Sequence, residues 1–302
     1  MAPGARLRKT SAERHDGRNS PERDRLLSHF VTLLVGGYLL ILLALFVFQR
    51  NLLYYPETTR PDPVRSGLSE MTPLTAKSAD GLSLVSWYAE GKPDQPIVVY
   101  FQGNAGNIGG RGHKVRPFLD AGFGVLLVGF RSYGGNPGSP SEQGLLEDTK
   151  AALSLLEGSA RPLVFYGESL GTAVATITAA ELANSGKPVQ ALVLEAPFTS
   201  VTDAAQHHYF YVPVKWLLKD HFNQAARIKE VQAPVLIFHG ERDNTMPIRF
   251  GRALYDITDE PKASKWYPNA GHNDLFDYGA GDLSVEFILK NMVNNKLTPP
   301  LD

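Results

Sequence analysis

A run of nineteen residues without a charged side chain constrains the fold of this chain more than any other feature. It extends from Phe30 to Phe48 and reads FVTLLVGGYLLILLALFVF. A helix rises about 1.5 Å per residue, so the run would cover roughly 28 Å, close to the ~30 Å hydrocarbon core of a bilayer. It exceeds the ~7–15 apolar residues of a signal peptide, and no cleavage site of small residues follows it. We therefore predict an uncleaved transmembrane anchor at 30–48, in preference to a signal peptide or a buried core helix.

Basic residues are distributed unequally between the two sides of this run. Seven precede it and three follow within a comparable distance: Arg6, Arg8, Lys9, Arg14, Arg18, Arg23 and Arg25 before it, and Arg50, Arg60 and Arg65 after it. Because Lys and Arg favour the cytoplasmic side of a membrane, we expect a cytoplasmic N-terminus and the rest of the chain on the periplasmic, luminal or extracellular side. Residues 1–29 are rich in charge and poor in aromatic side chains, which predicts a disordered basic tail.

The composition of the 302 residues is ordinary for a globular protein, with 43% hydrophobic and 20% charged side chains. A net charge of −1 provides no general basic field, so we expect no nucleic-acid partner. The chain has no cysteine, which excludes disulfides, zinc–thiolate sites, iron–sulfur clusters and a cysteine nucleophile. Residues 49–72 hold Pro61 and Pro63 and are predicted to be a linker, while residues 73–302 suit one α/β domain.

Short apolar runs alternate with helix-compatible segments along this domain. The runs lie at 96–101, 124–130, 162–166, 191–194 and 234–239, and the helical segments at 111–119, 143–157, 170–184 and 247–256. Continuous apolar runs are typical of strands buried on both faces, so the pattern predicts a mostly parallel sheet covered by helices. Two β-rich runs, 74–78 and 82–90, flank Asp80-Gly81 and predict a hairpin at one edge. Functional residues are expected in loops beyond the carboxyl ends of the parallel strands.

The segment Gly167-Glu168-Ser169-Leu170-Gly171 matches G-x-S-x-G. It directly follows the apolar run 162–166 and precedes a helix-like segment, which is the context of a nucleophile elbow. There a serine sits on a sharp turn from strand to helix, with glycines allowing close approach of neighbouring backbone. Ser169 is therefore the candidate nucleophile.

A serine nucleophile needs a general base and a residue that orients the base. On this kind of sheet the chain order is serine, acid, histidine. His272 is the histidine that follows the last plausible acid, and Asp243 lies in the loop after the run 234–239. Each could alone be a helix-capping residue, but together with the elbow they predict a triad, with Glu241 as the fallback acid.

Acyl transfer also needs N–H donors aimed at the developing oxyanion. The N–H of Leu170, the residue after the nucleophile, is the first candidate. The second is the N–H of Asn104, in the glycine-rich loop 102–107 after the run 96–101. The same loop could instead be an ordinary turn in which Asn107 caps the next helix, and both interpretations can hold together.

Taken together, these motifs resemble the α/β-hydrolase superfamily, and more narrowly its membrane-anchored serine hydrolases with a single N-terminal anchor. The segments that carry the resemblance are YFQGNAGN, FRSYGGNPGSPSEQG, GESLGTA, LEAPFTS, HGERDNTMP and GHND. The resemblance implies an α/β-hydrolase fold at 73–302, with helices on both faces of the sheet and a short helical cap at about 197–233. It also implies Ser169, Asp243 and His272 as the triad, and the Asn104 and Leu170 N–H groups as the oxyanion hole.

Some eukaryotic members of this branch are depalmitoylating thioesterases, while many bacterial members have no defined substrate. This chain departs from the pattern at Gln102, where relatives commonly have histidine. Because the proposed oxyanion donor is a backbone N–H further along, we expect this change to tune activity rather than abolish it. Arg131 and Tyr133 are expected to pack and to form a turn beside the site.

The predicted cap is short and rich in aromatic and aliphatic side chains, which leaves the site fairly open. They are Tyr209, Phe210, Tyr211, Val212, Val214, Trp216, Leu217 and Leu218. They could form an apolar access face for lipid near the bilayer, or pack the cap on the core, and we favour packing. His207 and His208 lack metal-like helical spacing, and no H-E-x-x-H, P-loop or dinucleotide-binding motif is present.

The sequence therefore predicts a membrane-anchored serine hydrolase that cleaves carboxylic ester or thioester bonds of small-molecule, acyl or lipid-like substrates. No cofactor or metal is expected, and the predicted contact with the bilayer is through residues 30–48. A serine aminopeptidase or amidase on the same fold is the first alternative. A non-catalytic membrane-anchored binding module is the second. The sequence leaves the substrate and the oligomeric state open.

Overall fold

The structure is a computed structural model that describes residues 21–296. The chain divides into two compact units, residues 1–47 and 48–302. Helix α1 (Pro21–Leu53) begins before the predicted anchor and ends five residues after it. Its first turn contains Glu22 and Asp24 and its last turn Arg50, charges that suit the helix dipole. Within the described residues, α1 is the one helix long and apolar enough to cross a membrane.

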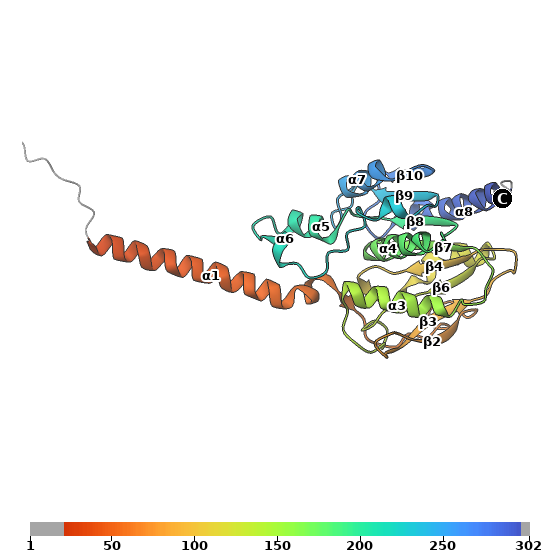
Figure 1. The fold of residues 1–302 in the computed structure, drawn as a ribbon, viewed down its shortest axis with the longest axis horizontal. Coiled ribbons are helices and arrows are strands. Elements are labelled where there is room, and N and C mark those ends of the chain that lie inside the picture. Colours follow the sequence, from red (N-terminus) through yellow and green to blue (C-terminus); the bar gives the residue numbers. More distant parts are fainter. Residues whose placement is uncertain (1–20, 297–302) are drawn as a thin grey trace, which may run out of the picture. The chain divides into compact units, whose positions relative to one another are not determined.

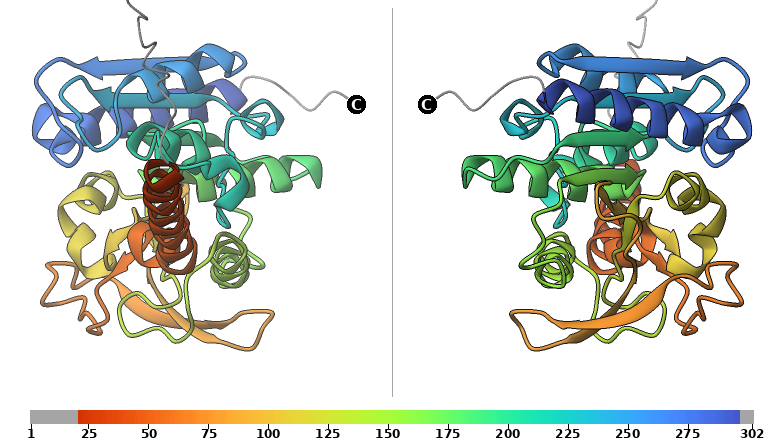
Figure 2. Two further views of the ribbon diagram at one scale, coloured as in Figure 1. Left: turned by 90° about the vertical axis from the view of Figure 1, so that its left-hand side faces the viewer. Right: turned by 90° about the vertical axis from the view of Figure 1, so that its right-hand side faces the viewer.

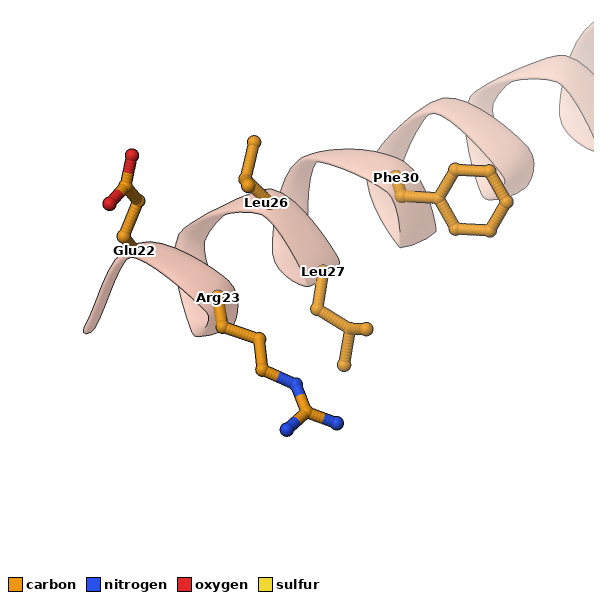
Figure 3. A pocket seen from close by; sticks show the side chains of 5 residues that line it. All are labelled: Glu22, Arg23, Leu26, Leu27 and Phe30. Atoms are coloured by element: carbon orange, nitrogen blue, oxygen red, sulfur yellow. The ribbon is translucent and has the colours of Figure 1, made fainter. Parts of the chain in front are cut away.

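The start of α1 changes from charged to apolar within two turns. Figure 3 shows the Glu22 and Arg23 side chains pointing away from the first turn, and Leu26, Leu27 and Phe30 pointing away from the following ones. The three apolar side chains are each more than half exposed. The predicted basic tail 1–29 thus overlaps the first turns of a helix, and residues 1–20 lie outside the described part of the chain.

The second unit is built on an eight-stranded sheet (Figure 1). Its spatial order is β10-β9-β8-β7-β4-β6-β3-β2. The strands are β2 (Thr72–Lys77), β3 (Ser83–Ala89), β4 (Ile97–Phe101), β6 (Gly124–Leu127), β7 (Leu163–Glu168), β8 (Ala191–Glu195), β9 (Val235–Gly240) and β10 (Lys262–Tyr267). Strand β3 pairs antiparallel with β2 and β6, and the other pairs are parallel. The mostly parallel sheet and its edge hairpin are confirmed.

Helices cover both faces of this sheet, as the end-on views in Figure 2 show. They are α2 (Gly112–Asp120), α3 (Glu142–Ser154), α4 (Leu170–Asn184), α7 (Arg249–Ile257) and α8 (Ala280–Lys296). Alternate residues of β4 enter two cores: Val99 belongs to the core that includes residues of α3, α4 and α7, and Val98 to the core that includes residues of α2 and α8. Both faces of the sheet are therefore buried, which explains the continuous apolar runs.

A two-stranded parallel sheet, β1 (Tyr55–Pro56) with β5 (Ala105–Gly106), joins the predicted linker to the glycine-rich loop. Strands of two residues are too short to show a periodicity, so this pairing was not predictable from the sequence pattern. It ties residues 54–56 to the loop that contains Asn104. Part of the segment 49–72 therefore packs on the domain, so the segment is more than a spacer.

The cap between β8 and β9 contains α5 (Val201–His208), α6 (Val214–Leu217) and the 3-10 turn η2 (Ile228–Glu230). Val212 and Val214 are buried, as the packing interpretation required. That interpretation is wrong for Phe210, Tyr211 and Trp216, which are exposed. Trp216 belongs to α6, whose single turn can direct few side chains inward, and Phe210 and Tyr211 lie in the connection before it.

Candidate active site

Ser169 occupies the sharp turn between β7 and α4. Its φ of 49° and ψ of −115° lie in a region that residues other than glycine rarely adopt. The Ser169 N–H donates to the Glu195 carbonyl oxygen of the adjacent strand β8 at 2.9 Å. This strained backbone holds the hydroxyl at the carboxyl end of the sheet, as a nucleophile elbow requires.

Two glycines make this turn sterically possible. A Cβ on Gly171 would lie 2.1 Å from the Phe101 carbonyl oxygen, and one on Gly167 would lie 2.5 Å from the Thr172 Cα. Both contacts are with backbone, which cannot move aside without shifting β4 or α4. The glycines of the motif are therefore required for close approach of α4 to the sheet.

The structure brings Ser169, His272 and Asp243 together from three loops at the same edge of the sheet. His272, after β10, lies with Nε2 3.0 Å from Ser169 Oγ and with Nδ1 2.6 Å from Asp243 Oδ2. A carboxylate only accepts hydrogen bonds, so Nδ1–H donates to Asp243 and Nε2 is free to accept from the serine hydroxyl. The fallback acid, Glu241, is exposed and instead pairs with Arg252 at 2.9 Å.

Asp243 is buried and held as a carboxylate by several donors. The N–H groups of Thr245 and Met246 donate to Oδ1 at 2.9 and 2.7 Å. Burial by itself would raise the pKa of Asp243, but hydrogen bonds from His239 and His272, the charge on His272 and the Met246 N–H together hold its pKa well below the usual range. An ionised Asp243 can fix the His272 tautomer.

His239 is a member of this cluster that the sequence reasoning missed. It lies in β9 with Nε2 2.7 Å from the Met246 carbonyl oxygen and 3.1 Å from Asp243 Oδ2. Since a carbonyl oxygen only accepts, the proton is on Nε2. His239 Nδ1 is buried and has no hydrogen-bond partner within residues 21–296. The signal available in the sequence was its position four residues before Asp243.

Asn104 is fixed in the loop after β4 by three hydrogen bonds. Its carbonyl oxygen accepts from the Tyr55 N–H at 2.8 Å and from the Tyr133 hydroxyl at 2.7 Å. Its side-chain amide donates to the Leu53 carbonyl oxygen at 2.8 Å. The preceding Gly103 lies against the nucleophile, because a Cβ built there would be 3.5 Å from Ser169 Cβ. The loop therefore borders the serine.

Leu170 is the first residue of α4. The first N–H groups of a helix have no acceptor within the helix, so the Leu170 N–H has the position of an oxyanion donor. The neighbouring Gln102 is buried, and within the described residues its side-chain amide has no hydrogen-bond partner. Asn107 caps the turn η1 (Ile108–Arg111) by accepting from the Gly109 N–H, so the loop also serves its structural role.

A buried charge network lies behind the elbow, and the sequence reasoning did not anticipate it. Lys114 Nζ bridges Glu168 Oε1 at 3.0 Å and Glu195 Oε1 at 2.8 Å, and Arg111 Nε lies 2.7 Å from Glu168 Oε2. The Tyr100 hydroxyl donates to Glu168 at 2.9 Å. Burial opposes ionisation of Glu168, but the charges of Lys114 and Arg111 outweigh it and lower the pKa of Glu168 to about 2.

The network includes the residue before Ser169 in the chain and the residue beside Ser169 in the neighbouring strand. Glu168 directly precedes the serine, and Glu195 accepts the Ser169 N–H with its carbonyl oxygen. The Tyr166 hydroxyl donates to the Glu195 carboxylate at 2.7 Å. Every carboxylate oxygen of this pair therefore has a donor, so the ends of β7 and β8 are held in register by paired charges.

The last part of the cap is hydrogen-bonded to the elbow through one buried side-chain amide, that of Gln224. Gln224 Nε2 donates to Thr172 Oγ1 at 3.0 Å, and Thr172 Oγ1 donates to the Ser169 carbonyl oxygen at 2.6 Å. The Thr176 hydroxyl donates to Gln224 Oε1 at 3.2 Å. Gln224 is fully buried. This part of the cap is therefore continuous with the elbow.

Arg131 and Tyr133 have the packing roles expected of them. Arg131 forms ion pairs with Asp148 at 2.7 Å and Asp80 at 2.8 Å, while Tyr133 is buried. Among residues 21–296, no group of three or more His, Asp or Glu side chains has the arrangement of a metal site.

The sequence and the fold of this chain are both similar to those of known proteins. No protein-family model matches the sequence. The uncharacterised protein Rv2307c of Mycobacterium tuberculosis is 37% identical over 232 residues, which cover 75% of this chain and 81% of that protein. The lysophosphatidylserine lipase ABHD12 of Danio rerio is 33% identical over 196 residues, or 59% of this chain and 51% of that protein. The solved esterase Pf2001 of Pyrococcus furiosus superposes with a TM-score of 0.62 at 16% identity, covering 80% of this chain and 98% of that one.

The chain has the α/β-hydrolase fold. The resemblance and the fold class predicted from the sequence motifs are both confirmed. The similarity to Pf2001 is one of fold, because the sequences share few residues. The matched region spans about half the length of ABHD12.

Proposed function

We propose that this α/β hydrolase is a membrane-anchored serine hydrolase that cleaves carboxylic ester or thioester bonds in acyl or lipid-like substrates. The observation that carries the proposal is the pair of hydrogen bonds from Ser169 through His272 to Asp243. A buried chain of this kind, on a strained elbow, is what activates a serine hydroxyl. The lipase and esterase names among its relatives support ester cleavage.

In the acylation step, Ser169 Oγ attacks the carbonyl carbon of the substrate while His272 Nε2 takes the hydroxyl proton. The carbonyl oxygen becomes an oxyanion that accepts hydrogen bonds from the Leu170 and Asn104 N–H groups. His272 then gives its proton to the departing alcohol or thiol as the bond to the carbonyl carbon breaks. An acyl group remains on Ser169 Oγ.

In the deacylation step, water attacks the acyl carbon and gives a proton to His272 Nε2. The second oxyanion collapses, the bond to Ser169 Oγ breaks, and His272 returns the proton to the serine. Asp243 remains ionised throughout and holds Nδ1–H of His272. The products are a carboxylic acid and the regenerated enzyme, so the cycle needs no cofactor or metal.

Membrane anchoring through residues 30–48 is the second part of the proposal. The exposed apolar surface of α1 and its length support it. The excess of Lys and Arg before the run supports a cytoplasmic N-terminus, with the hydrolase domain on the opposite side. Protease treatment of intact, sealed membranes tests this orientation: added protease digests the hydrolase domain from outside, and protection of that domain contradicts it.

Labelling with a fluorophosphonate probe tests the nucleophile. The full-length wild type in membranes should be labelled, Ser169→Ala should lose labelling completely, and His272→Ala should be labelled at least about 10²-fold more slowly. Equal labelling of all three proteins would end the proposal. A panel of acyl esters, lysophospholipids, acyl thioesters and aminoacyl amides then separates ester or thioester cleavage from the amidase alternative.

A further inference from the structure

Three aromatic side chains of the cap, two between α5 and α6 and one in α6, are exposed to solvent. Trp216 is 83% exposed, Phe210 79% and Tyr211 52%. Neighbouring Val212 and Val214 are buried, so the segment is folded with a fixed inner face and an aromatic outer face. A patch of large apolar side chains that is this exposed marks an interaction surface. Each ring that stays in water forgoes the favourable free energy that it would gain on burial.

This aromatic surface, defined as Phe210, Tyr211 and Trp216, is held beside the residues that directly follow the apolar run. Gln49 Nε2 donates to the Leu217 carbonyl oxygen at 3.1 Å, and the Lys219 N–H donates to Gln49 Oε1 at 2.7 Å. Arg50 forms a two-pronged ion pair with the buried Asp220, at 2.9 and 3.1 Å. A chain leaving a bilayer after Phe48 therefore meets α6 within its next two residues.

The surface also adjoins the catalytic edge of the sheet. His208 Nε2, at the end of α5, lies 3.1 Å from the carbonyl oxygen of Thr245, in the loop that holds Asp243. An acyl chain bound at the aromatic surface would thus lie next to the loop that carries Asp243. This continuity with both the anchor and the site identifies lipid as the occupant.

We propose that Phe210, Tyr211 and Trp216 insert into the headgroup region of the bilayer that holds α1, and that acyl substrates pass from that bilayer to Ser169. The proposal rests on the membrane anchoring and hydrolase activity proposed above. Aromatic side chains are favoured at the membrane interface, where their rings meet acyl chains while polar atoms stay hydrated. Lys215, exposed between them, suits the same interface.

Tryptophan fluorescence tests the location of the surface. The chain has three tryptophans; Trp87 is buried, Trp266 is half-buried and Trp216 is exposed. Full-length wild type and Trp216→Phe are reconstituted in phosphatidylcholine vesicles with or without bromine on the upper part of the acyl chains. The emission lost in Trp216→Phe is expected to be quenched at least about twofold by the brominated lipid and to be shielded from iodide in the buffer.

Emission of Trp216 that brominated lipid does not quench overturns the proposal. If iodide then reaches Trp216, the surface faces water. If neither quencher reaches it, the surface is covered by protein, such as a second copy of this chain.

Activity measurements give an independent test. The double variant Phe210→Ser/Trp216→Ser is compared with Leu289→Ser, a control at an apolar residue 41% exposed on α8, at the opposite end of the domain from α6 (Figure 1). We expect the double variant to lose roughly threefold to tenfold of its rate on a long-chain ester embedded in the vesicles, and the control to lose none. Both should retain the wild-type rate on a soluble short-chain ester, which also shows that they are folded.

Equal loss on both substrates, or no loss on the embedded ester, contradicts the docking role. A different result would show that the proposed hydrolase function itself is wrong. In that case Ser169→Ala keeps hydrolysing the soluble ester, whatever the Trp216 quenching shows.

Discussion

His239 Nε2 lies 3.1 Å from Asp243 Oδ2, the same oxygen that faces His272 Nδ1 at 2.6 Å. Asp243 is therefore held between two histidines as well as two backbone N–H groups. His239 donates to it from inside the sheet, where the imidazole is fully buried and cannot rotate freely. We infer that His239 is a positioning residue that keeps the carboxylate aligned with His272.

Replacement of His239 by phenylalanine should lower kcat about tenfold to hundredfold on a soluble ester, because a donor to a buried carboxylate is lost. The pKa of Asp243 should rise, because one of the donors that lower it is lost. His239→Gln, whose amide can still donate, should recover part of kcat. Steady-state rates between pH 4 and 9 measure both effects, and identical behaviour of the two variants would show that only packing is at stake.

Tyr133→Phe should lower kcat by roughly threefold to tenfold with little change in KM. The lost hydroxyl anchors the Asn104 carbonyl oxygen at 2.7 Å, and a neutral hydrogen bond of this kind contributes about 0.5–1.5 kcal/mol. Loosening the loop should weaken the oxyanion donor more than substrate binding. Tyr88→Phe, at a half-buried tyrosine in β3, is the control. A change confined to KM would place Tyr133 in substrate binding instead.

Gly171→Ala should destabilise the protein by at least about 3 kcal/mol, because the added Cβ would lie 2.1 Å from the Phe101 carbonyl oxygen. Gly110→Ala is the matched control, since a Cβ there meets nothing within 4 Å. Thermal unfolding in detergent compares the two variants. A Tm of Gly171→Ala equal to that of Gly110→Ala would mean that α4 can move away from β4.

Acid should destabilise the domain through Glu168. Its pKa is lowered from 4.5 to about 2 in the folded protein, so between these values the unfolded chain binds more protons than the folded one. The free energy of unfolding therefore falls as the pH is lowered from about 5 to about 2, by on the order of 3 kcal/mol from this group. In Glu168→Gln the fall should be smaller. Denaturant unfolding at several pH values measures it, and parallel pH profiles would exclude Glu168 as the source.

The features that depend on neighbouring residues, or on the order of residues along the chain, were predictable from the sequence. Ser169 lies in a five-residue motif with a strand before it and a helix after it, and both extend to positions close to those predicted. His272 and Asp243 followed from the order of residues along the chain, because each comes just after a strand of the parallel sheet. Strands buried on both faces produced apolar runs that were recognisable without any alignment.

Contacts between distant segments were not predictable in the same way. Lys114 is 54 residues from Glu168 and 81 from Glu195, and nothing in their local sequences signals a shared ion pair. The Tyr133 bond to Asn104 likewise depends on the order in which strands lie in the sheet. Composition also could not separate Val214 from Trp216, since both are apolar and only the geometry of a one-turn helix decides which is buried.

The buried Gln224 divides the cap into two parts with different freedom to vary during evolution. Its hydrogen bond to Thr172 makes the returning segment part of the framework that supports Ser169. Residues 201–218 form the outer portion of the cap, where Phe210, Tyr211 and Trp216 are exposed. We expect this outer portion to tolerate insertions, deletions and exchange between homologues, so that substrate range can diversify there. The position of Gln224 should resist change, because a new residue would disturb the reaction centre along with the specificity.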